Sequence, residues 1–394
     1  MTGRFAEIQG AVCAEGLDGW LFMDHHRRDP LAYRLLEFEP PRVATRRWYY
    51  LIPAQGEPRG LVHQVEATML DALPGDKLVY SSWRSHRAGL AELLAGLRTV
   101  AMQYSPDCAI PYVAMVDAGT VELVRSYGIQ VTSSADLVQY FEARWTHEQL
   151  AWHLEAGRRV DAIRREAFRR IGAELRAGRS PTEAGIKHFI LEAFRREGLI
   201  TDHGPIVAVN DNTSNPHYEP SAAGSREIRD GDWVLIDLWA KLDRPEAVYY
   251  DSTWVGFCGE QAPSEMTRVF EIVREARDRA IRLVQEAVRR GQSLRGYEVD
   301  DAARDYIREQ GLAERFIHRT GHSIGREVHG AGANMDNLET HDERRIIPRT
   351  CFSIEPGVYL ERFGVRSEVN VFVGDEEARV TGEIQQAPVA ILRP

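Results

Sequence analysis

Apolar residues in the second half of the chain recur at the spacing of a helix surface. From His147 onward, apolar positions fall every three or four residues, with arginines and glutamates on the other face, which predicts a long amphipathic helix. The apolar positions of this stretch are Val160, Ile163, Ala167, Ile171 and Leu175. The arginine pairs scattered along the helices are interpreted as solvated faces rather than as a nucleic-acid-binding stripe.

A second helix is predicted after a capping signal at residues 180–183. Ser180 is the expected N-cap, Pro181 the first-turn proline and Glu183 the glutamate of a capping box. Gly198 marks the end of this helix. The pattern returns later in the chain, with a long helix predicted over residues 264–291 and a shorter one ending at Gly311.

Four apolar runs have the composition of strands, and each carries one acidic residue. They are VLIDLWA with Asp237, VYYDSTWVGF with Asp251, CFSIEPGVYL with Glu355 and VRSEVNVFV with Glu368. The first two acids lie fourteen positions apart and the last two thirteen. Because each pair of runs follows two helices and a segment containing glycine and histidine, the pattern predicts an internal structural duplication whose halves share one site.

The first 145 residues follow a different pattern, in which short apolar runs alternate with helical stretches. The runs are GWLFMD, RWYYLIPA, DKLVYSS and RTVAMQY, and the helical stretches include LAELLAGL and GTVELVRSYGI. This alternation predicts βα units. A chain of 394 residues is also long enough for two domains, which we expect at residues 1–145 and 146–394.

Composition narrows the choice of partners. Acidic residues outnumber basic ones, 59 against 49, and the formal charge of -10 argues against a nucleic-acid or anionic-membrane partner. No apolar run reaches the length of a bilayer span, and the first residues lack the apolar core of a signal peptide. The four cysteines are far apart and form no CxxC motif, which favours a reduced, cytoplasmic setting.

Acids on apolar strands are costly to bury unless a positive charge compensates them. The acids of the four runs, together with His322 in the segment HRTGHSIGREVHG, form an oxygen-rich ligand set that suits Mn, Co, Fe or Zn. Two such ions held about 3.5–4 Å apart by bridging carboxylates can share a hydroxide and polarise a scissile carbonyl. Any one of these acids alone is better explained as a surface or salt-bridged residue, whereas the ordered set of five favours a metal centre.

Three further histidines are candidates for substrate contact and for stabilising a reaction intermediate. His318 and His329 flank His322 in the same segment, and His217 lies in the loop NPHYEP ahead of the first strand pair. Taken alone, His217 fits a surface loop as well as a site residue.

These residues and the strings around them resemble the metallopeptidase family with the pita-bread fold, which includes methionine aminopeptidase, aminopeptidase P and prolidase. The matching strings, within residues 147–394, are IVAVN, HYEP, DGDWVLIDLWA, YYDSTWVGF, HRTGHSIGREVHG, SIEPGVYL and VRSEVNVFV. The resemblance implies an α+β fold, with a C-terminal pita-bread domain of duplicated helix pairs on a curved antiparallel sheet and a smaller N-terminal α/β domain. Residues 1–145 are similar to the N-terminal domain of aminopeptidase P, prolidase and creatinase, which favours the Xaa-Pro-cleaving branch.

The resemblance also implies a role for each site residue. It implies two divalent metal ions, with Mn the first choice and Co, Fe or Zn the alternatives. Asp237 is expected to chelate one ion, while Asp251 and Glu368 bridge both. His322 and Glu355 are expected to complete the coordination of the second ion. Glu355 is also expected to act as proton shuttle for the attacking water. His217, His318 and His329 match the histidines that contact substrate and stabilise the intermediate. Arg366 stands where aminopeptidase P-like enzymes have a site arginine, and Thr253 matches a hydroxyl that orients a carboxylate ligand.

Three positions depart from the family pattern without removing a ligand. Trp239 and Ser323 stand where glycine is common, and Gly330 stands where an acidic residue is often found. The gap before Asp251 is also a few residues longer. Together these differences are expected to reshape the substrate pocket.

The function implied by the resemblance is a dinuclear metal-dependent exopeptidase that cleaves the Xaa-Pro bond of dipeptides or short peptides. We expect a homodimer that acts on small peptides and has no nucleic-acid or membrane partner. Two alternatives stay open. One is a metal-dependent hydrolase of another small amide on the same fold, related to creatinase or ectoine hydrolase, and the other is a binding module that has lost catalysis.

Overall fold

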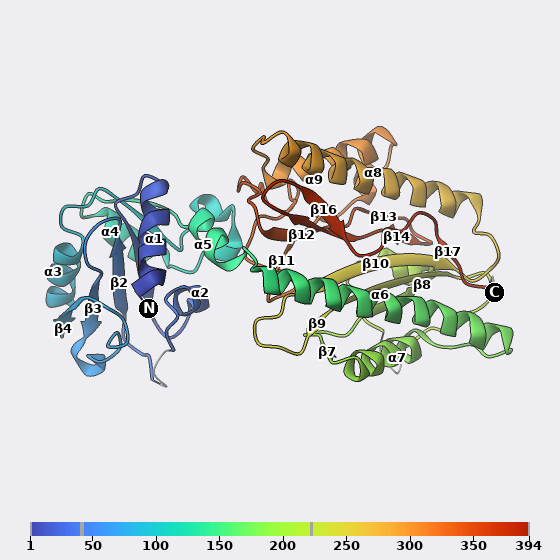
Figure 1. Ribbon diagram of the computed structural model, residues 1–394, viewed down its shortest axis with the longest axis horizontal. Coiled ribbons are helices and arrows are strands. Elements are labelled where there is room, and N and C mark those ends of the chain that lie inside the picture. The colour runs from blue at the N-terminus through green and yellow to red at the C-terminus, as the bar shows by residue number, and fades with distance from the viewer. Residues whose placement is uncertain (1, 40–42, 221–223, 393–394) are drawn as a thin grey trace. The chain divides into compact units, whose positions relative to one another are not determined.

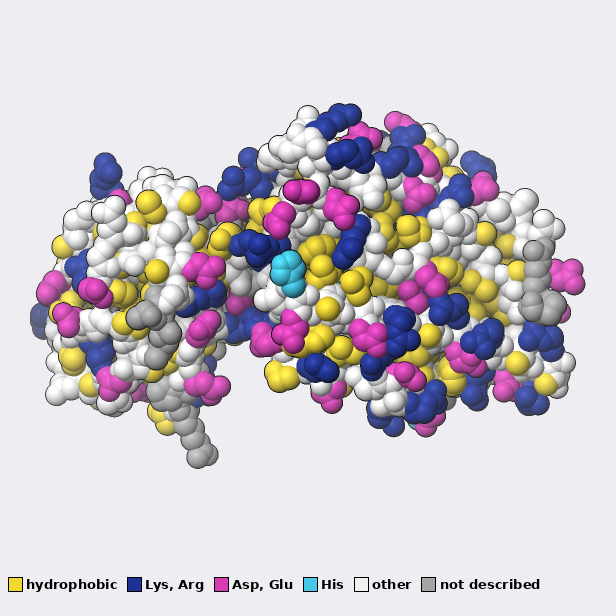
Figure 2. Space-filling view, viewed as in Figure 1, with side chains coloured by type: hydrophobic (Ala, Val, Ile, Leu, Met, Phe, Trp, Pro, Cys, Tyr) yellow, Lys and Arg dark blue, Asp and Glu magenta, His cyan; other side chains and the backbone are white. Residues whose placement is uncertain are grey.

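The computed structural model describes residues 2–39, 43–220 and 224–392, and its chain divides into two units, Met1–Glu142 and Ala143–Pro394. On the face drawn in Figure 2, Lys and Arg side chains are interspersed with Asp and Glu side chains over both units. Within the described ranges, no helix is long and apolar enough to cross a membrane.

The first unit is built on one mixed sheet with the strand order β4-β3-β2-β1-β5-β6. Its strands are β1 (Gly19–Asp24), β2 (Trp48–Pro53), β3 (Arg59–His63), β4 (Asp76–Tyr80), β5 (Thr99–Met102) and β6 (Gln130–Ser133). Its helices are α1 (Thr2–Ala14), α2 (Pro30–Leu35), α3 (Trp83–Leu93), α4 (Ala118–Arg125) and α5 (Ala135–Glu142). The β3–β4 and β5–β6 pairs are parallel, as βα units require, whereas β1, β2 and β3 pair antiparallel. The predicted βα alternation therefore describes only part of this sheet.

The second unit repeats one order of elements. Its first half consists of α6 (His147–Arg176), α7 (Glu183–Arg196), β7 (Leu199–Ile200), β8 (Ile206–Val209), β9 (Trp233–Leu242) and β10 (Tyr250–Phe257). Its second half consists of α8 (Ser264–Arg289), α9 (Gly296–Glu309), β11 (Ser323–Ile324), β12 (Thr350–Ile354), β13 (Gly357–Tyr359), β14 (Gly364–Arg366), β15 (Val369–Val373), β16 (Ala378–Thr381) and β17 (Val389–Ala390). In each half two helices precede antiparallel strands, which is the duplication that the sequence predicts.

The helices of each half cover the strands of the same half. In Figure 1, α6 runs along β9 and β10, and α8 lies against α9 and the strands β14 and β16. The apolar positions Val160, Ile163, Ala167 and Ile171 are buried in the core beneath α6, which confirms the predicted helix face. One member of an arginine pair does not follow the prediction. Arg164 is fully buried rather than solvated, because it ion-pairs with Asp161 inside the unit.

The strands position the acids in two ways. Asp237 and Asp251 lie within the long antiparallel strands β9 and β10, where Thr253 stands opposite Asp237. Glu355 and Glu368 lie in short breaks, between β12 and β13 and between β14 and β15. Pro356 follows Glu355 directly, and because proline donates no hydrogen bond to a ladder, it accounts for the first break.

The cap predicted for α7 is wrong in detail. The N-cap is Thr182, whose side chain accepts a hydrogen bond from the Gly185 backbone N–H at 3.1 Å. Glu183 is the first helical residue and points into the protein instead of closing a capping box. Its carboxylate accepts four hydrogen bonds, from the Val209 N–H (2.9 Å), the Arg226 N–H (2.9 Å), Asn212 Nδ2 (2.9 Å) and the Tyr218 hydroxyl (2.7 Å).

Replacing Glu183 with alanine is expected to lower the free energy of unfolding by about 3 kcal/mol, because each buried donor left without an acceptor costs roughly 1–3 kcal/mol. Urea denaturation followed by circular dichroism measures this change. The exposed Glu192→Ala variant on the same helix is the control and is expected to stay within about 0.5 kcal/mol of the wild type. Equal stability of the two variants would contradict the role assigned to Glu183.

Candidate metal centre

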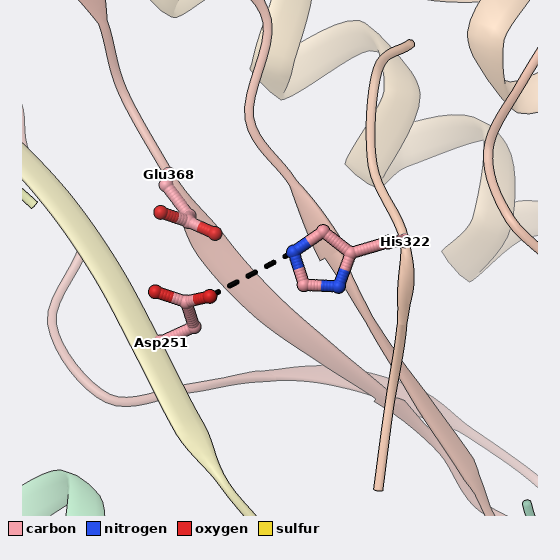
Figure 3. A group of neighbouring side chains, drawn as sticks. All are labelled: Asp251, His322 and Glu368. Carbon is pink, nitrogen blue, oxygen red and sulfur yellow. Dashed lines mark ion pairs between the residues drawn. The ribbon is translucent and has the colours of Figure 1, made fainter. Parts of the chain in front are cut away.

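Three buried side chains from different elements converge in the second unit. Asp251 comes from β10, Glu368 from the break before β15 and His322 from the residue before β11 (Figure 3). One ligand atom from each lies within 4.8 Å of the others. His322 Nε2 is 3.7 Å from Asp251 Oδ2. This cluster is the centre of the candidate site.

Glu355 joins the cluster at the same imidazole nitrogen of His322 that lies near Asp251. Its Oε1 atom lies 3.3 Å from His322 Nε2 and accepts a hydrogen bond from the Ser353 hydroxyl at 3.0 Å. The same hydroxyl oxygen accepts the His322 backbone N–H at 2.9 Å. Ser353 therefore fixes an acid and a histidine in relation to one another.

Asp237 is held by a different partner. Its carboxylate accepts a hydrogen bond from the buried Arg366 guanidinium. Arg366 also donates to Thr253 Oγ1 at 3.2 Å, and its Nε lies 3.8 Å from Glu355 Oε2. The Thr253 hydroxyl in turn donates to Glu368 Oε2 at 2.7 Å. All five predicted ligands thus belong to one connected network.

Three acids of this network, Asp251, Glu355 and Glu368, resist ionisation. Burial raises the pKa of Asp251 well above its ordinary value, and the charges of Asp237 and Glu355 add to the effect. Burial and the neighbouring Asp251 raise the pKa of Glu368 in the same way, and burial raises the pKa of Glu355 to about 7. Burial also lowers the pKa of His322, so the imidazole stays neutral and keeps a lone pair for a ligand.

The donor atoms fit a divalent cation. Asp251 Oδ1 and Glu368 Oε1 are buried and have no hydrogen-bond partner among the described residues. Buried polar atoms are normally paired, so two carboxylate oxygens without partners in one cluster indicate that something else completes them. Carboxylate oxygens with one neutral imidazole form a hard ligand set suited to Mn, Co, Fe or Zn.

The three remaining histidines differ in their relation to the cluster. The His329 ring centre lies 4.2 Å from that of His322, and His329 is exposed. His318 Nδ1 lies 2.7 Å from the Arg319 carbonyl oxygen, so it donates there and leaves Nε2 to accept from the Tyr359 hydroxyl at 2.7 Å. Burial and the nearby Arg366 lower the pKa of His318 to about 3. His217 lies on the exposed loop ahead of β9, and its role stays a prediction.

Three residues of the network were missed by the sequence analysis. The Tyr359 hydroxyl accepts from Arg366 Nη1 at 3.1 Å while it donates to His318. Asn370 accepts the Asp251 N–H at 3.1 Å through Oδ1 and donates to the Asp251 carbonyl through Nδ2. Ser353 and Asn370 each lie two residues from an acid, and the period of two along a strand is the signal that could have found them.

The chain belongs to metallopeptidase family M24, whose profile matches residues 153–375. A probable dipeptidase PepE of Mycobacterium tuberculosis is 34% identical over 224 residues, which span 56% of this chain and 56% of that protein. An Xaa-Pro dipeptidase of Pyrococcus furiosus is 32% identical over 176 residues, 44% of this chain and 45% of that protein. The chain therefore matches about half the length of these curated relatives. Membership of this family implies the use of a divalent metal.

Solved structures extend the likeness in fold to nearly the whole chain. The dipeptidase PepE of Mycobacterium ulcerans has a TM-score of 0.69 at 22% identity, covering 99% of this chain and 97% of that one. A prolidase of Thermococcus sibiricus has a TM-score of 0.63 at 22% identity, covering 98% of each chain. The two-unit, mixed α/β architecture with duplicated helix pairs is thus the pita-bread architecture expected from the sequence.

Divalent metal is expected to raise the melting temperature of the metal-stripped protein by roughly 5–10 °C at 100 times Kd, because a ligand that binds only the folded state stabilises it by about 2.7 kcal/mol. Differential scanning calorimetry with Mn²⁺ measures the rise. The Asp251→Asn variant is expected to lose most of this rise. Its metal-free form is not expected to melt lower than the wild type, because burial already disfavours the charge on Asp251.

The control is Asp375→Asn, which removes an exposed acid that lies outside the cluster. This variant should keep the full metal-dependent rise. A rise of equal size in Asp251→Asn would show that the metal binds elsewhere.

Proposed function

We propose that this protein is a dinuclear metal-dependent exopeptidase that hydrolyses the Xaa-Pro bond of dipeptides or short peptides. The observation that carries the proposal is the buried cluster of Asp251, His322 and Glu368, in which two carboxylate oxygens have no hydrogen-bond partner among the described residues. Family membership and relatives named Xaa-Pro dipeptidase support the choice of reaction.

Two ions would be held by the five proposed ligands. Asp237 would bind one ion, Asp251 and Glu368 would be shared by both, and His322 and Glu355 would complete the second. When bound, the two ions lower the pKa of the attacking water and polarise the scissile carbonyl. Mn is the proposed native metal, with Co, Fe and Zn as alternatives that the same donors accept.

Other side chains of the network handle protons and orientation. Glu355, which accepts a hydrogen bond from Ser353 and lies beside His322, is suited to take a proton from the attacking water and to deliver it to the leaving nitrogen. The neutral ring of His318, oriented by Tyr359, is suited to contact the substrate. The Arg366 guanidinium holds Asp237 and keeps a positive charge in a site that is otherwise crowded with acids. His217 and His329 are the proposed contacts at the outer side of the site.

The size of the substrate is limited by Trp239. Trp239 stands directly opposite Asp251 in the β9–β10 register, and side chains at opposed positions share one face of a sheet. Its indole Nε1 donates to Asp202 Oδ1 at 2.8 Å, which fixes the ring. A large fixed ring beside a proposed ligand favours dipeptides and short peptides over long chains.

Two further features belong to the proposal. A homodimer is the proposed assembly, on the basis of the resemblance to aminopeptidase P and prolidase. A cytoplasmic setting is supported by the four cysteines, all of which are free.

The metal-loaded protein is expected to release proline from Xaa-Pro dipeptides and to lose this activity in a chelator. A panel of Xaa-Pro dipeptides, Xaa-Pro-containing tripeptides and matched Xaa-Ala peptides, assayed for free proline and for the N-terminal residue, measures chain-length preference and proline preference together. Faster hydrolysis of Xaa-Ala than of Xaa-Pro would refute the proline claim. Failure to cleave any peptide by a metal-loaded protein would favour the alternative hydrolase of another small amide.

The Tyr359→Phe variant is expected to lower kcat by about 10–100-fold, because loss of a hydroxyl that orients a site residue commonly costs that much. Its affinity for metal is expected to stay unchanged, since Tyr359 bonds to His318 and Arg366 and not to the clustered acids. Steady-state kinetics and calorimetry separate the two effects. The control is Tyr306→Phe on α9, and unchanged kcat in Tyr359→Phe would contradict the proposed role of His318.

A further inference from the structure

Two arginines are completely buried beneath the helices that cover the site-bearing strands. Arg164 comes from α6 and Arg277 from α8, and both side chains are 0% exposed. The two helices are the first of their respective halves. Burying a guanidinium is costly unless its donors find acceptors, so the recurrence of such a residue in both halves requires a reason.

Each arginine donates to a serine that is a sequence neighbour of a proposed bridging ligand. Arg164 Nη1 donates to Ser252 Oγ at 3.1 Å, and Arg277 Nη1 donates to Ser367 Oγ at 2.6 Å. Both serines are buried, at 1% and 0% exposure. Ser252 directly follows one bridging acid and Ser367 directly precedes the other. The same arrangement, a buried arginine bonded to a serine next to a proposed bridging ligand, therefore occurs in both halves.

The serines and the acids make separate sets of contacts. Neighbouring side chains on a strand point to opposite faces, so Ser252 faces α6 while Asp251 faces the cluster. On the cluster side, Glu368 is bonded to Thr253. Each serine hydroxyl thus ties the backbone next to a proposed ligand to an arginine of the covering helix, and it makes no contact with the ligand atoms.

A short segment joins the two arginines. Arg164 Nη2 donates to Glu383 Oε2 at 2.7 Å, and Arg277 Nη1 donates to the Gln385 carbonyl at 2.9 Å. The Gln385 side chain exchanges two hydrogen bonds with the Val255 backbone on β10, at 2.7 and 3.1 Å. Residues 383–385 therefore connect the supports of both halves to the strand that carries Asp251.

We propose that Arg164 and Arg277 are positioning residues that set the separation of Asp251 and Glu368 through Ser252 and Ser367, and thereby set the metal affinity of the site. The proposal deepens the proposed function, since it rests on these acids bridging two metals. A merely structural role, in which the arginines only attach helices to strands, predicts a loss of stability with the metal affinity unchanged.

The test is the double variant Ser252→Ala/Ser367→Ala. Alanine removes both hydroxyls but leaves Arg164 its bond to Glu383 and Arg277 its bond to Gln385, so the fold is expected to persist. Calorimetry of the metal-stripped protein with Mn²⁺ is expected to show a Kd weakened by about 10–100-fold, the usual effect of losing residues that support metal ligands. The visible absorption spectrum of the Co²⁺-loaded variant is expected to shift, because the ligand geometry changes.

Two comparisons make the result decisive. Ser134→Ala, a buried serine of the first unit, is the control and should bind metal as the wild type does. Each single variant should show part of the loss of metal affinity, because each half supports one acid. If the double variant does not fold, the two single variants provide the test. Melting of the metal-free forms records the structural contribution separately.

Wild-type metal affinity and an unshifted Co²⁺ spectrum in the double variant would overturn the proposal, even if the melting temperature fell. A wild-type protein that takes up no divalent metal would overturn it as well. A wrong assignment of the peptidase function would give a different result. The wild type would bind metal and the serine variants would bind it more weakly, but no Xaa-Pro peptide would be cleaved.

Discussion

The burial of several acids beside one another is the constraint on which the second unit depends. Asp251, Glu355 and Glu368 all have raised pKa values because burial and neighbouring carboxylates disfavour their charged forms. Arg366 is one cation of the network, and it is already bonded to Asp237. A divalent cation from solution would favour the charged forms of these acids, and the oxygens of Asp251 and Glu368 that have no hydrogen-bond partner among the described residues are the proposed ligands.

Duplication is an efficient way to build such a site. A single strand pair can bring two acids together, but the backbone around them must be rigid, because like charges push the strands apart. In this protein each half contributes two acids, and Asn370 of one half pairs with both backbone groups of Asp251 of the other. The two halves are therefore hydrogen-bonded to each other at one of the clustered acids.

The sequence predicted the features that have a local signal. Helical periodicity located α6, and the acidic residue in each apolar run marked the strands that meet at the site. It could not predict contacts between distant segments. Glu183 has the sequence signature of a capping box, yet four donors outside its own helix turn it inward. Arg164 was predicted to be solvated because its neighbours along α6 are charged. Only the tertiary structure shows that it donates to Ser252 and Glu383.

The ligands and the substrate pocket are under separate physical constraints, which explains why the metal set is easier to infer than the substrate. A ligand position tolerates almost no change, since loss of one carboxylate removes a donor to the proposed metal ions. Trp239 faces the same side of the sheet as Asp251 but donates to Asp202, so its size can change without removing a contact from any proposed ligand. Substrate preference can therefore diverge among proteins that have the same proposed ligands, and residues such as Trp239 indicate it better than the ligands do.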